Sequence, residues 1–143
     1  MSDARRTVCL DFDGVIHLNN GTHGATIISG EPVAGVVHAI EQMREQYKVV
    51  IFSARCSEPG GVEAIKDWLS VQGIEVDGVV DYKPLALVYV DDRGLSFDGD
   101  WSATMDQIEG FEPWYVHHNR EKARKRQRFQ LPVRGRRRAP PPR

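Results

Sequence analysis

The chain alternates short apolar runs with longer segments in which apolar side chains recur every three or four positions. The short runs are rich in valine, isoleucine and leucine, which is typical of strands buried on both faces of a parallel sheet. They cover residues 7–10, 48–52 and 85–90, and a further β-type segment covers residues 74–80. The pattern therefore predicts four strands.

Two segments with helical spacing separate these strands. Glu31-Pro32 opens the first segment and Pro59 opens the second, which ends at Gly73 because glycine favours the left-handed conformation of a helix end. The apolar faces are formed by Val33, Val36, Val37, Ile40, Met43 and Tyr47 in the first segment, and by Val62, Ile65, Trp68 and Leu69 in the second. This spacing predicts two helices that each bury one face.

The remaining segments carry weaker patterns. Asn20-Gly21, within residues 15–28, predicts a hairpin. A modest helix is expected near residues 103–108, and residues 114–116 are a candidate fifth strand. Strands alternating with helices predict an α/β fold, namely a three-layer Rossmann-like sandwich around a mostly parallel sheet.

The charge of the chain is unevenly distributed. From Arg120 onward, eleven Lys/Arg accompany one acid, whereas the preceding residues hold eight basic and nineteen acidic side chains, giving +10 and −11. We therefore assign residues 1–118 to one domain and residues 119–143 to a basic, disordered tail. Such a tail could bind nucleic-acid backbone; alternatively it is solvated or folds back onto the acidic body.

The sequence contains no signal that directs it to a membrane or to an oxidising compartment. No run approaches the roughly 18 apolar residues of a membrane span, and the first residues lack the apolar stretch of a signal peptide. Cys9 and Cys56 form neither a disulfide framework nor a metal-binding spacing. We expect a cytoplasmic protein without membrane contact, whose oligomeric state the sequence does not indicate.

Four aspartates follow two of the predicted strands. Asp11 and Asp13 come after residues 7–10, and Asp91-Asp92 comes after residues 85–90. Since ligands bind beyond the carboxyl ends of parallel strands, we expect these carboxylates to share one crevice. Carboxylates about 4 Å apart repel by roughly 1 kcal/mol per pair in water, and more in a partly dry site. A hard divalent cation relieves that repulsion, and oxygen-only ligation favours Mg²⁺ over Zn²⁺.

The aspartates belong to a longer ordered pattern. It consists of Asp11-x-Asp13-Gly14, Ser53 after a strand, Lys83-Pro84, and Asp91-Asp92. In this order the pattern resembles the haloacid dehalogenase (HAD) superfamily of aspartate-nucleophile phosphatases, over roughly residues 7–117. Ser53-Ala54-Arg55 and Asp91-Asp92-Arg93 also resemble the phosphatase half of phage polynucleotide kinase/phosphatase proteins. The chain lacks a phosphate-binding G-x-x-x-x-G-K-[ST] loop, which argues against a kinase activity.

The resemblance implies a hydrolase acting on phosphoric monoesters. Asp11 would be the nucleophile that forms an aspartyl-phosphate. Asp13 would be the general acid/base, with a pKa raised by its acidic neighbours. The resemblance also implies two sets of binding residues: Ser53, Lys83 and Arg55 for the substrate phosphate, and Asp11, the Asp13 backbone carbonyl and an acid from Asp91-Asp92 for Mg²⁺.

Each assignment has a plainer alternative. Aspartates at strand ends also serve as turn residues and helix caps, and Ser53 and Lys83 also fit ordinary loop positions. Arg55 and Arg93 fit surface ion pairs as well as phosphate contacts. His17 and His23, in the predicted hairpin, could approach a substrate but are interpreted as solvated loop histidines.

The short spacing between the motifs bears on the substrate. The residues between Gly14 and Phe52 and between Ala54 and Tyr82 leave no room for a cap domain, so we expect an open site. An open site admits the end of a polymer or borrows a lid from another subunit. The favoured substrates are nucleic-acid ends or nucleotides. The alternatives are a non-catalytic nucleic-acid-binding protein on the same scaffold and a small-molecule nucleotidase capped by oligomerisation.

Overall fold

The computed structural model describes residues 4–19 and 24–130 of the chain. It divides into two compact units, Met1–Glu112 and Pro113–Arg143. The first unit contains every described strand and three of the described α-helices, and the second contains one α-helix. None of the helices in the described ranges is long and apolar enough to cross a membrane.

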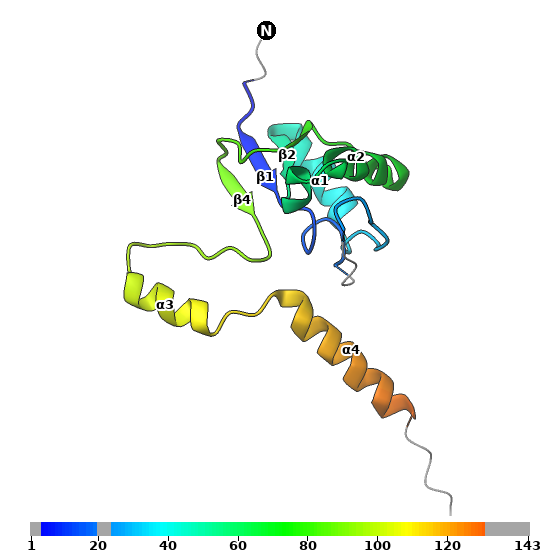
Figure 1. The fold of residues 1–143 in the computed structure, drawn as a ribbon, viewed down its shortest axis with the longest axis vertical. Coiled ribbons are helices and arrows are strands. Elements are labelled where there is room, and N and C mark those ends of the chain that lie inside the picture. The colour runs from blue at the N-terminus through cyan, green and yellow to red at the C-terminus, as the bar shows by residue number, and fades with distance from the viewer. Residues whose placement is uncertain (1–3, 20–23, 131–143) are drawn as a thin grey trace, which may run out of the picture. The chain divides into compact units, whose positions relative to one another are not determined.

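The first unit is built on a four-stranded parallel sheet. Its strands are β1 (Thr7–Leu10), β2 (Lys48–Phe52), β3 (Gly78–Val80) and β4 (Val88–Val90). Their order is β3-β2-β1-β4, so β1 lies between β2 and β4 (Figure 1). Because every pair is parallel, the carboxyl ends of β1 and β4 meet at the same edge of the sheet.

Two helices connect the first three strands. They are α1 (Val36–Gln46), between β1 and β2, and α2 (Gly61–Gln72), between β2 and β3. Both crossovers step across the sheet in the same direction, and right-handed crossovers of this kind place their helices on one face. Figure 1 shows α1 and α2 together on one side of the strands. The result is a Rossmann-like α/β unit.

The core lies between these two helices and the sheet. Its fully buried side chains include Phe12, Ile16, Ile40, Ile51, Ile65 and Val49. Each buried side chain of this size contributes about 1.5–3 kcal/mol relative to an exposed one. Phe12 meets Trp68 of α2 edge to face, with ring centroids 5.2 Å apart. The residue that separates Asp11 from Asp13 thus anchors both to the core.

The opposite face of the sheet is crossed by the chain between β3 and β4. The hydroxyl of Tyr89 donates a hydrogen bond to the carbonyl of Pro84 at 2.6 Å, and the Lys83 ammonium lies 4.4 Å from the centroid of the Tyr89 ring. Tyr89 is paired with the buried Cys9, so both side chains project from this face. Leu87 then joins the sheet by donating to the carbonyl of Thr7 at 2.8 Å.

The strands and helices of the first unit match the sequence predictions with shifted ends, and α1 begins at Val36 instead of at Glu31-Pro32. The predicted burial of the run 85–90 on both faces is wrong, because β4 is an edge strand and its three residues are exposed. Both β3 and β4 are shorter than the runs 74–80 and 85–90, because the flanking residues form the connections around them. Described residues 15–19 and 24–28 form turns and single bridges instead of strands, and Asn20-Gly21 lies outside the described residues. The expected helix near 103–108 is α3 (Trp101–Glu109), capped by the Asp100 side chain.

The expected fifth strand is wrong. Residues 114–116 begin α4 (Trp114–Gln130), the helix of the second unit. Pro113 precedes them and favours a helix start, and the following Arg, Lys, Glu, Gln and Ala residues are good helix formers. Residues 117–128 of α4 are exposed throughout. Residues 119–130, which the charge pattern assigned to a tail, are therefore helical, with residues 119–128 exposed, and residues 131–143 lie outside the description.

Candidate active site

Three carboxylates converge where β1 and β4 end. The backbone N–H of Asp11 donates to the carbonyl of Val90 at 2.9 Å, which ties the end of β1 to the end of β4. One carboxylate oxygen from each of Asp11, Asp91 and Asp92 lies within 4.8 Å of the others. Such a group of hard oxygen donors is chemically suited to a divalent cation.

The pKa values show that this group is electrostatically strained. Burial, followed by the nearby carboxylates of Asp92 and Asp91, raises the pKa of Asp11 to about 8, against the hydrogen bond from the Phe12 N–H. Burial also raises the pKa of Asp92, whose side chain is 3% exposed. The folded site therefore favours a proton or a cation among these oxygens.

Gly14 allows Asp92 to approach the loop. It has a φ of 82°, a conformation that residues with a side chain rarely adopt. A Cβ at this position would also overlap the Asp92 carboxylate. The glycine that ends the first acidic motif is therefore needed both for the turn and for the close packing of the second motif.

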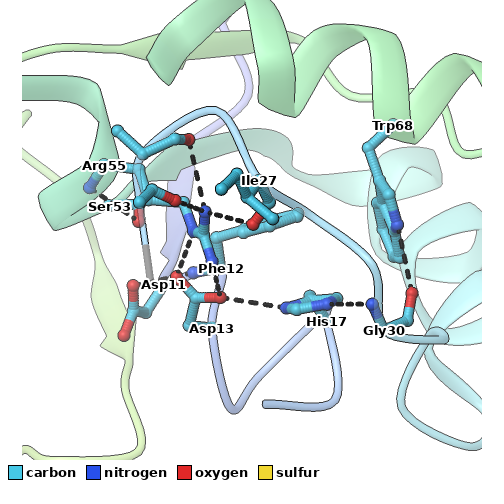
Figure 2. Close-up of polar contacts among 11 residues, drawn as sticks. Asp11, Phe12, Asp13, His17, Ile27, Gly30, Ser53, Arg55 and Trp68 are labelled. Carbon is cyan, nitrogen blue, oxygen red and sulfur yellow. Dashed lines mark hydrogen bonds and ion pairs between the residues drawn. The ribbon is translucent and has the colours of Figure 1, made fainter. Parts of the chain in front are cut away.

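Asp13 lies in a different environment from Asp11. Its Oδ2 accepts a hydrogen bond from Arg55 Nε at 2.6 Å, and its Oδ1 accepts one from Arg55 Nη2 at 3.0 Å. The Nδ1 of His17 lies 2.9 Å from the same Oδ1. Figure 2 shows the resulting row of contacts, from Arg55 through Asp13 and His17 to Gly30 and Trp68, with the Asp11 carboxylate to one side.

The expected rise in the pKa of Asp13 is wrong. Burial acts to raise this pKa, but hydrogen bonds from His17 and Arg55 and the charge of Arg55 outweigh it and lower the pKa. The sequence predicts that Asp13 lies among other carboxylates, whereas its side chain contacts the guanidinium of Arg55 and the imidazole of His17. It is Asp11 that carries the raised pKa.

Arg55 links Asp13 to a neighbouring loop. Its Nη1 donates to the carbonyls of Gly24, Ala25 and Ile27, at 2.7, 3.2 and 3.0 Å. The Arg55 side chain is only 10% exposed, so these contacts replace its hydration. Arg55, which the sequence predicts to bind phosphate, therefore lies between the Asp13 carboxylate and the backbone carbonyls of residues 24–27.

Ser53 and Lys83 occupy separate positions. Ser53 follows β2, is 3% exposed and caps a short 3₁₀ helix (Ala54–Ser57) by accepting from the N–H of Arg55 at 3.3 Å. Lys83 belongs to the segment that crosses the sheet, where it lies over Tyr89.

Arg93 donates its backbone N–H to Asp91 Oδ1 at 2.8 Å, and its Nε lies 4.0 Å from Asp92 Oδ2.

His17 is the site residue that the sequence interpretation missed. It is 1% exposed, so its interpretation as a solvated histidine is wrong; His23 lies outside the described residues. Two signals point to a buried His17: Val15, Ile16 and Leu18 surround it, and it stands four residues after Asp13. The prediction of a hairpin within residues 15–28 led to the interpretation of His17 as a solvated loop residue.

No family model and no curated protein matches this chain. Among solved structures, the chain is similar to that of a conserved protein coded by a locus from Bacteroides thetaiotaomicron, with a TM-score of 0.51 and 20% identity. The match covers 78% of this chain and 95% of that one. At this level of identity the likeness shows a shared fold and carries no statement about chemistry.

Proposed function

We propose that this chain is a Mg²⁺-dependent phosphomonoesterase of the HAD type that works through an aspartyl-phosphate. The observation that carries the proposal is the separation of Asp11 from Asp13. Asp11 joins Asp91 and Asp92 in an acidic group, whereas Asp13 pairs with Arg55 and His17. Two carboxyls held in environments that move their pKa values apart are suited to two different roles in one reaction.

The acidic group fits the proposed metal. Asp11, Asp91 and Asp92 offer carboxylate oxygens alone, and the pKa of Asp11 is raised first by burial and then by the neighbouring carboxylates, both of which a cation would offset. These three side chains, with the Asp13 backbone carbonyl, would hold Mg²⁺. When bound, the ion would neutralise charge on the phosphoryl group during transfer.

The residues of the chain would divide the hydrolysis into two displacements. Asp11 attacks phosphorus and the ester oxygen leaves with a proton from Asp13; water then attacks the aspartyl-phosphate and returns a proton to Asp13. The lowered pKa of Asp13 keeps its carboxylate ionised, so its role as the acid requires that the negative charge of an entering phosphate raise that pKa. The resemblance also gives Ser53, Lys83 and Arg55 contacts with phosphoryl oxygens; these would require Lys83 to leave its place over Tyr89 and Arg55 to use a donor position that Asp13 and the loop carbonyls leave.

A capless site with a three-layer core is part of the same proposal. In the described residues, the chain between Asp13 and Ser53 contributes α1, and the chain between Ser53 and Lys83 contributes α2 and β3. Neither stretch contains a separate inserted domain. Such a site would take a phosphate at the end of a large substrate.

Nucleic-acid ends are the substrates that the charge of the second unit favours. The exposed α4 carries Arg120, Lys122, Arg124, Lys125, Arg126 and Arg128. A helix with this charge attracts phosphate backbones through counterion release. Mononucleotides are the smaller alternative within the same class of ester.

A substrate screen tests the proposal. The full chain is assayed with an aryl phosphate, 3′-phosphorylated and 5′-phosphorylated oligonucleotides, mononucleotides and sugar phosphates, with Mg²⁺ or with EDTA. We expect phosphate release that requires Mg²⁺ and is lost in Asp11→Asn. Full activity in that variant would contradict the role of Asp11 as the nucleophile.

A second candidate function follows from α4. The chain would then be a non-catalytic nucleic-acid-binding protein that uses the α/β unit as a scaffold and the exposed basic helix as its binding arm. Salt-sensitive binding of oligonucleotides without turnover of any ester in the screen would favour this function over the first.

A further inference from the structure

The hydrogen bonds of His17 assign its protonation state. Its Nε2 lies 2.9 Å from the backbone N–H of Gly30, which can only donate, so this ring nitrogen accepts and carries no proton. The proton of the neutral ring therefore resides on Nδ1, which lies 2.9 Å from Asp13 Oδ1. His17 thus donates to the carboxylate of Asp13.

The ring has no freedom to turn away from this arrangement. It stacks on Phe12 with centroids 5.3 Å apart and planes 7° apart, and Trp68 meets it edge to face at 5.4 Å. Trp68 Nε1 also donates to the Gly30 carbonyl at 3.2 Å. This contact fixes the position of Gly30, whose N–H determines the tautomer of His17. Core packing and two backbone contacts therefore fix the Nδ1–H group on Asp13.

The donors around Asp13 distinguish its two oxygens. A carboxylate oxygen has two lone-pair positions. Oδ1 uses both, one for His17 and one for Arg55 Nη2, whereas Oδ2 accepts from Arg55 Nε alone among the described residues. The remaining lone pair of Oδ2 is the position from which Asp13 can exchange a proton with a substrate or a water molecule.

We propose that His17 is a positioning residue that occupies Oδ1 of Asp13 and so directs proton transfer through Oδ2. The catalytic part of this inference rests on the proposed function, because it concerns the acid/base of that reaction. The assignment of the tautomer and of the contact does not. Misplacing a reacting group by about 1 Å can cost about 100-fold in rate. Loss of His17 is therefore expected to lower kcat by about 10–100-fold with little change in KM.

Two substitutions separate donation from packing. His17→Asn keeps a side-chain N–H at the position of Nδ1 but gives up the imidazole stack and the Gly30 contact. His17→Leu fills the space between Phe12 and Trp68 but has no donor. If His17 acts on Asp13, the Asn variant retains kcat despite a lower melting temperature, and the Leu variant loses kcat. A merely structural role predicts that kcat follows the melting temperature in both.

A third substitution, at Gly30, disturbs His17 on the side of Nε2, away from Asp13. A Cβ at Gly30 would overlap His17 Nε2 and the Leu18 carbonyl, so Gly30→Ala should displace the ring without touching Asp13. Gly78→Ala is the matched control, because a Cβ there meets nothing within 4 Å. We expect Gly30→Ala to lower kcat as His17→Leu does, and Gly78→Ala to leave it unchanged. Equal values for the two variants would contradict the inference.

Nitrogen NMR of the full chain tests the assignment without a substrate. At neutral pH we expect His17 to show a protonated Nδ1 and a bare Nε2, with an Nδ1 resonance that shifts in Asp13→Asn. A proton on Nε2, or no response to Asp13→Asn, would overturn the inference. An inactive wild-type protein with the expected spectrum would remove the proposed function alone. An active wild type whose Leu variant keeps full kcat would remove the positioning role alone.

Discussion

Asp11 and Asp13 are two residues apart on one loop, yet the structure gives them opposite electrostatics. Burial and two neighbouring carboxylates raise the pKa of Asp11 to about 8, whereas Arg55 and His17 lower that of Asp13 against the effect of burial. The chain bends at the buried Phe12 that lies between them. The chemistry that we propose depends on this division more than on the number of acidic residues.

The raised pKa of Asp11 makes the stability of the metal-free protein depend on pH. Between the ordinary value of 3.8 and about 8, the folded protein holds a proton that the unfolded chain has released, so the free energy of unfolding falls as the pH rises. We expect a loss of roughly 2 kcal/mol from pH 5 to pH 8, after discounting for the solvent at this half-buried group. Urea unfolding in EDTA should show a flatter profile for Asp11→Asn. Parallel profiles would contradict the prediction.

The burial and mutual repulsion of the Asp11, Asp91 and Asp92 carboxylates also predict that Mg²⁺ stabilises the folded protein. Mg²⁺ at 100 times its dissociation constant should stabilise the protein by about 2.7 kcal/mol, visible as a rise in melting temperature. Asp92→Asn should abolish most of that rise because it removes a buried carboxylate of the proposed site. Asp67→Asn, at an exposed carboxylate of α2, is the control and should respond like the wild type. An equal response of all three proteins would argue against a site at Asp11, Asp91 and Asp92.

At the residue scale, the sequence predicted the identity of the candidate site residues better than the contacts between them. A strand followed by Asp-x-Asp places both carboxylates at a sheet edge, because strand geometry is local. The contact of Arg55 with Asp13 joins residues 42 positions apart and depends on how β2 packs beside β1. The Gly30 contact that fixes His17 depends on an irregular loop, whose path no local pattern encodes.

At the scale of elements, the predictions held where one face of a segment is buried. Strand β2 occupies residues 48–52 as expected, and α2 ends at Gly73, which has a φ of 69°. The predicted strand at 114–116 failed because three β-prone residues do not outweigh a helical context of fourteen. Local helix propensity decided that segment, whereas β1, β2, α1 and α2 each bury a face in the core.

Gly14 connects the turn after β1 to the position of Asp92, and its replacement tests that connection. Gly14→Ala should cost about 1–2 kcal/mol for the left-handed backbone and, in addition, displace Asp92. Gly35→Ala is the matched control, since its φ is 83° and a Cβ there meets nothing within 4 Å. We expect comparable backbone costs in urea unfolding but a loss of turnover and of Mg²⁺ stabilisation in Gly14→Ala alone. The same loss in both variants would contradict the prediction.

At the scale of the whole molecule, the chain joins an acidic α/β unit to a basic helix. Over 78% of its length the chain shares its fold with a solved structure at 20% identity. The charge asymmetry was readable from the sequence because it needs only a count. The boundary between Glu112 and Pro113 was not, because it depends on where packing ends.

The basic helix predicts salt-dependent binding of nucleic acid. Replacing Lys122, Arg124, Lys125 and Arg126 by Gln should lower the affinity of the full chain for a single-stranded oligonucleotide. The slope of log affinity against log salt should become shallower by up to about 3, at about 0.7 per charge removed. Lys66→Gln, on α2, is the control and should leave the slope nearly unchanged. An unchanged slope in the fourfold variant would exclude α4 as the nucleic-acid contact.

The central claim is that Asp11 becomes phosphorylated, and trapping the phosphoenzyme tests it most directly. The full chain is mixed with Mg²⁺ and a phosphate ester that it hydrolyses, quenched in acid during turnover, digested and analysed by mass spectrometry. We expect one phosphoryl group on the peptide that contains Asp11, removable by hydroxylamine as an acyl phosphate is, and absent from Asp11→Asn. Turnover without any adduct, or with full activity in Asp11→Asn, would contradict the account.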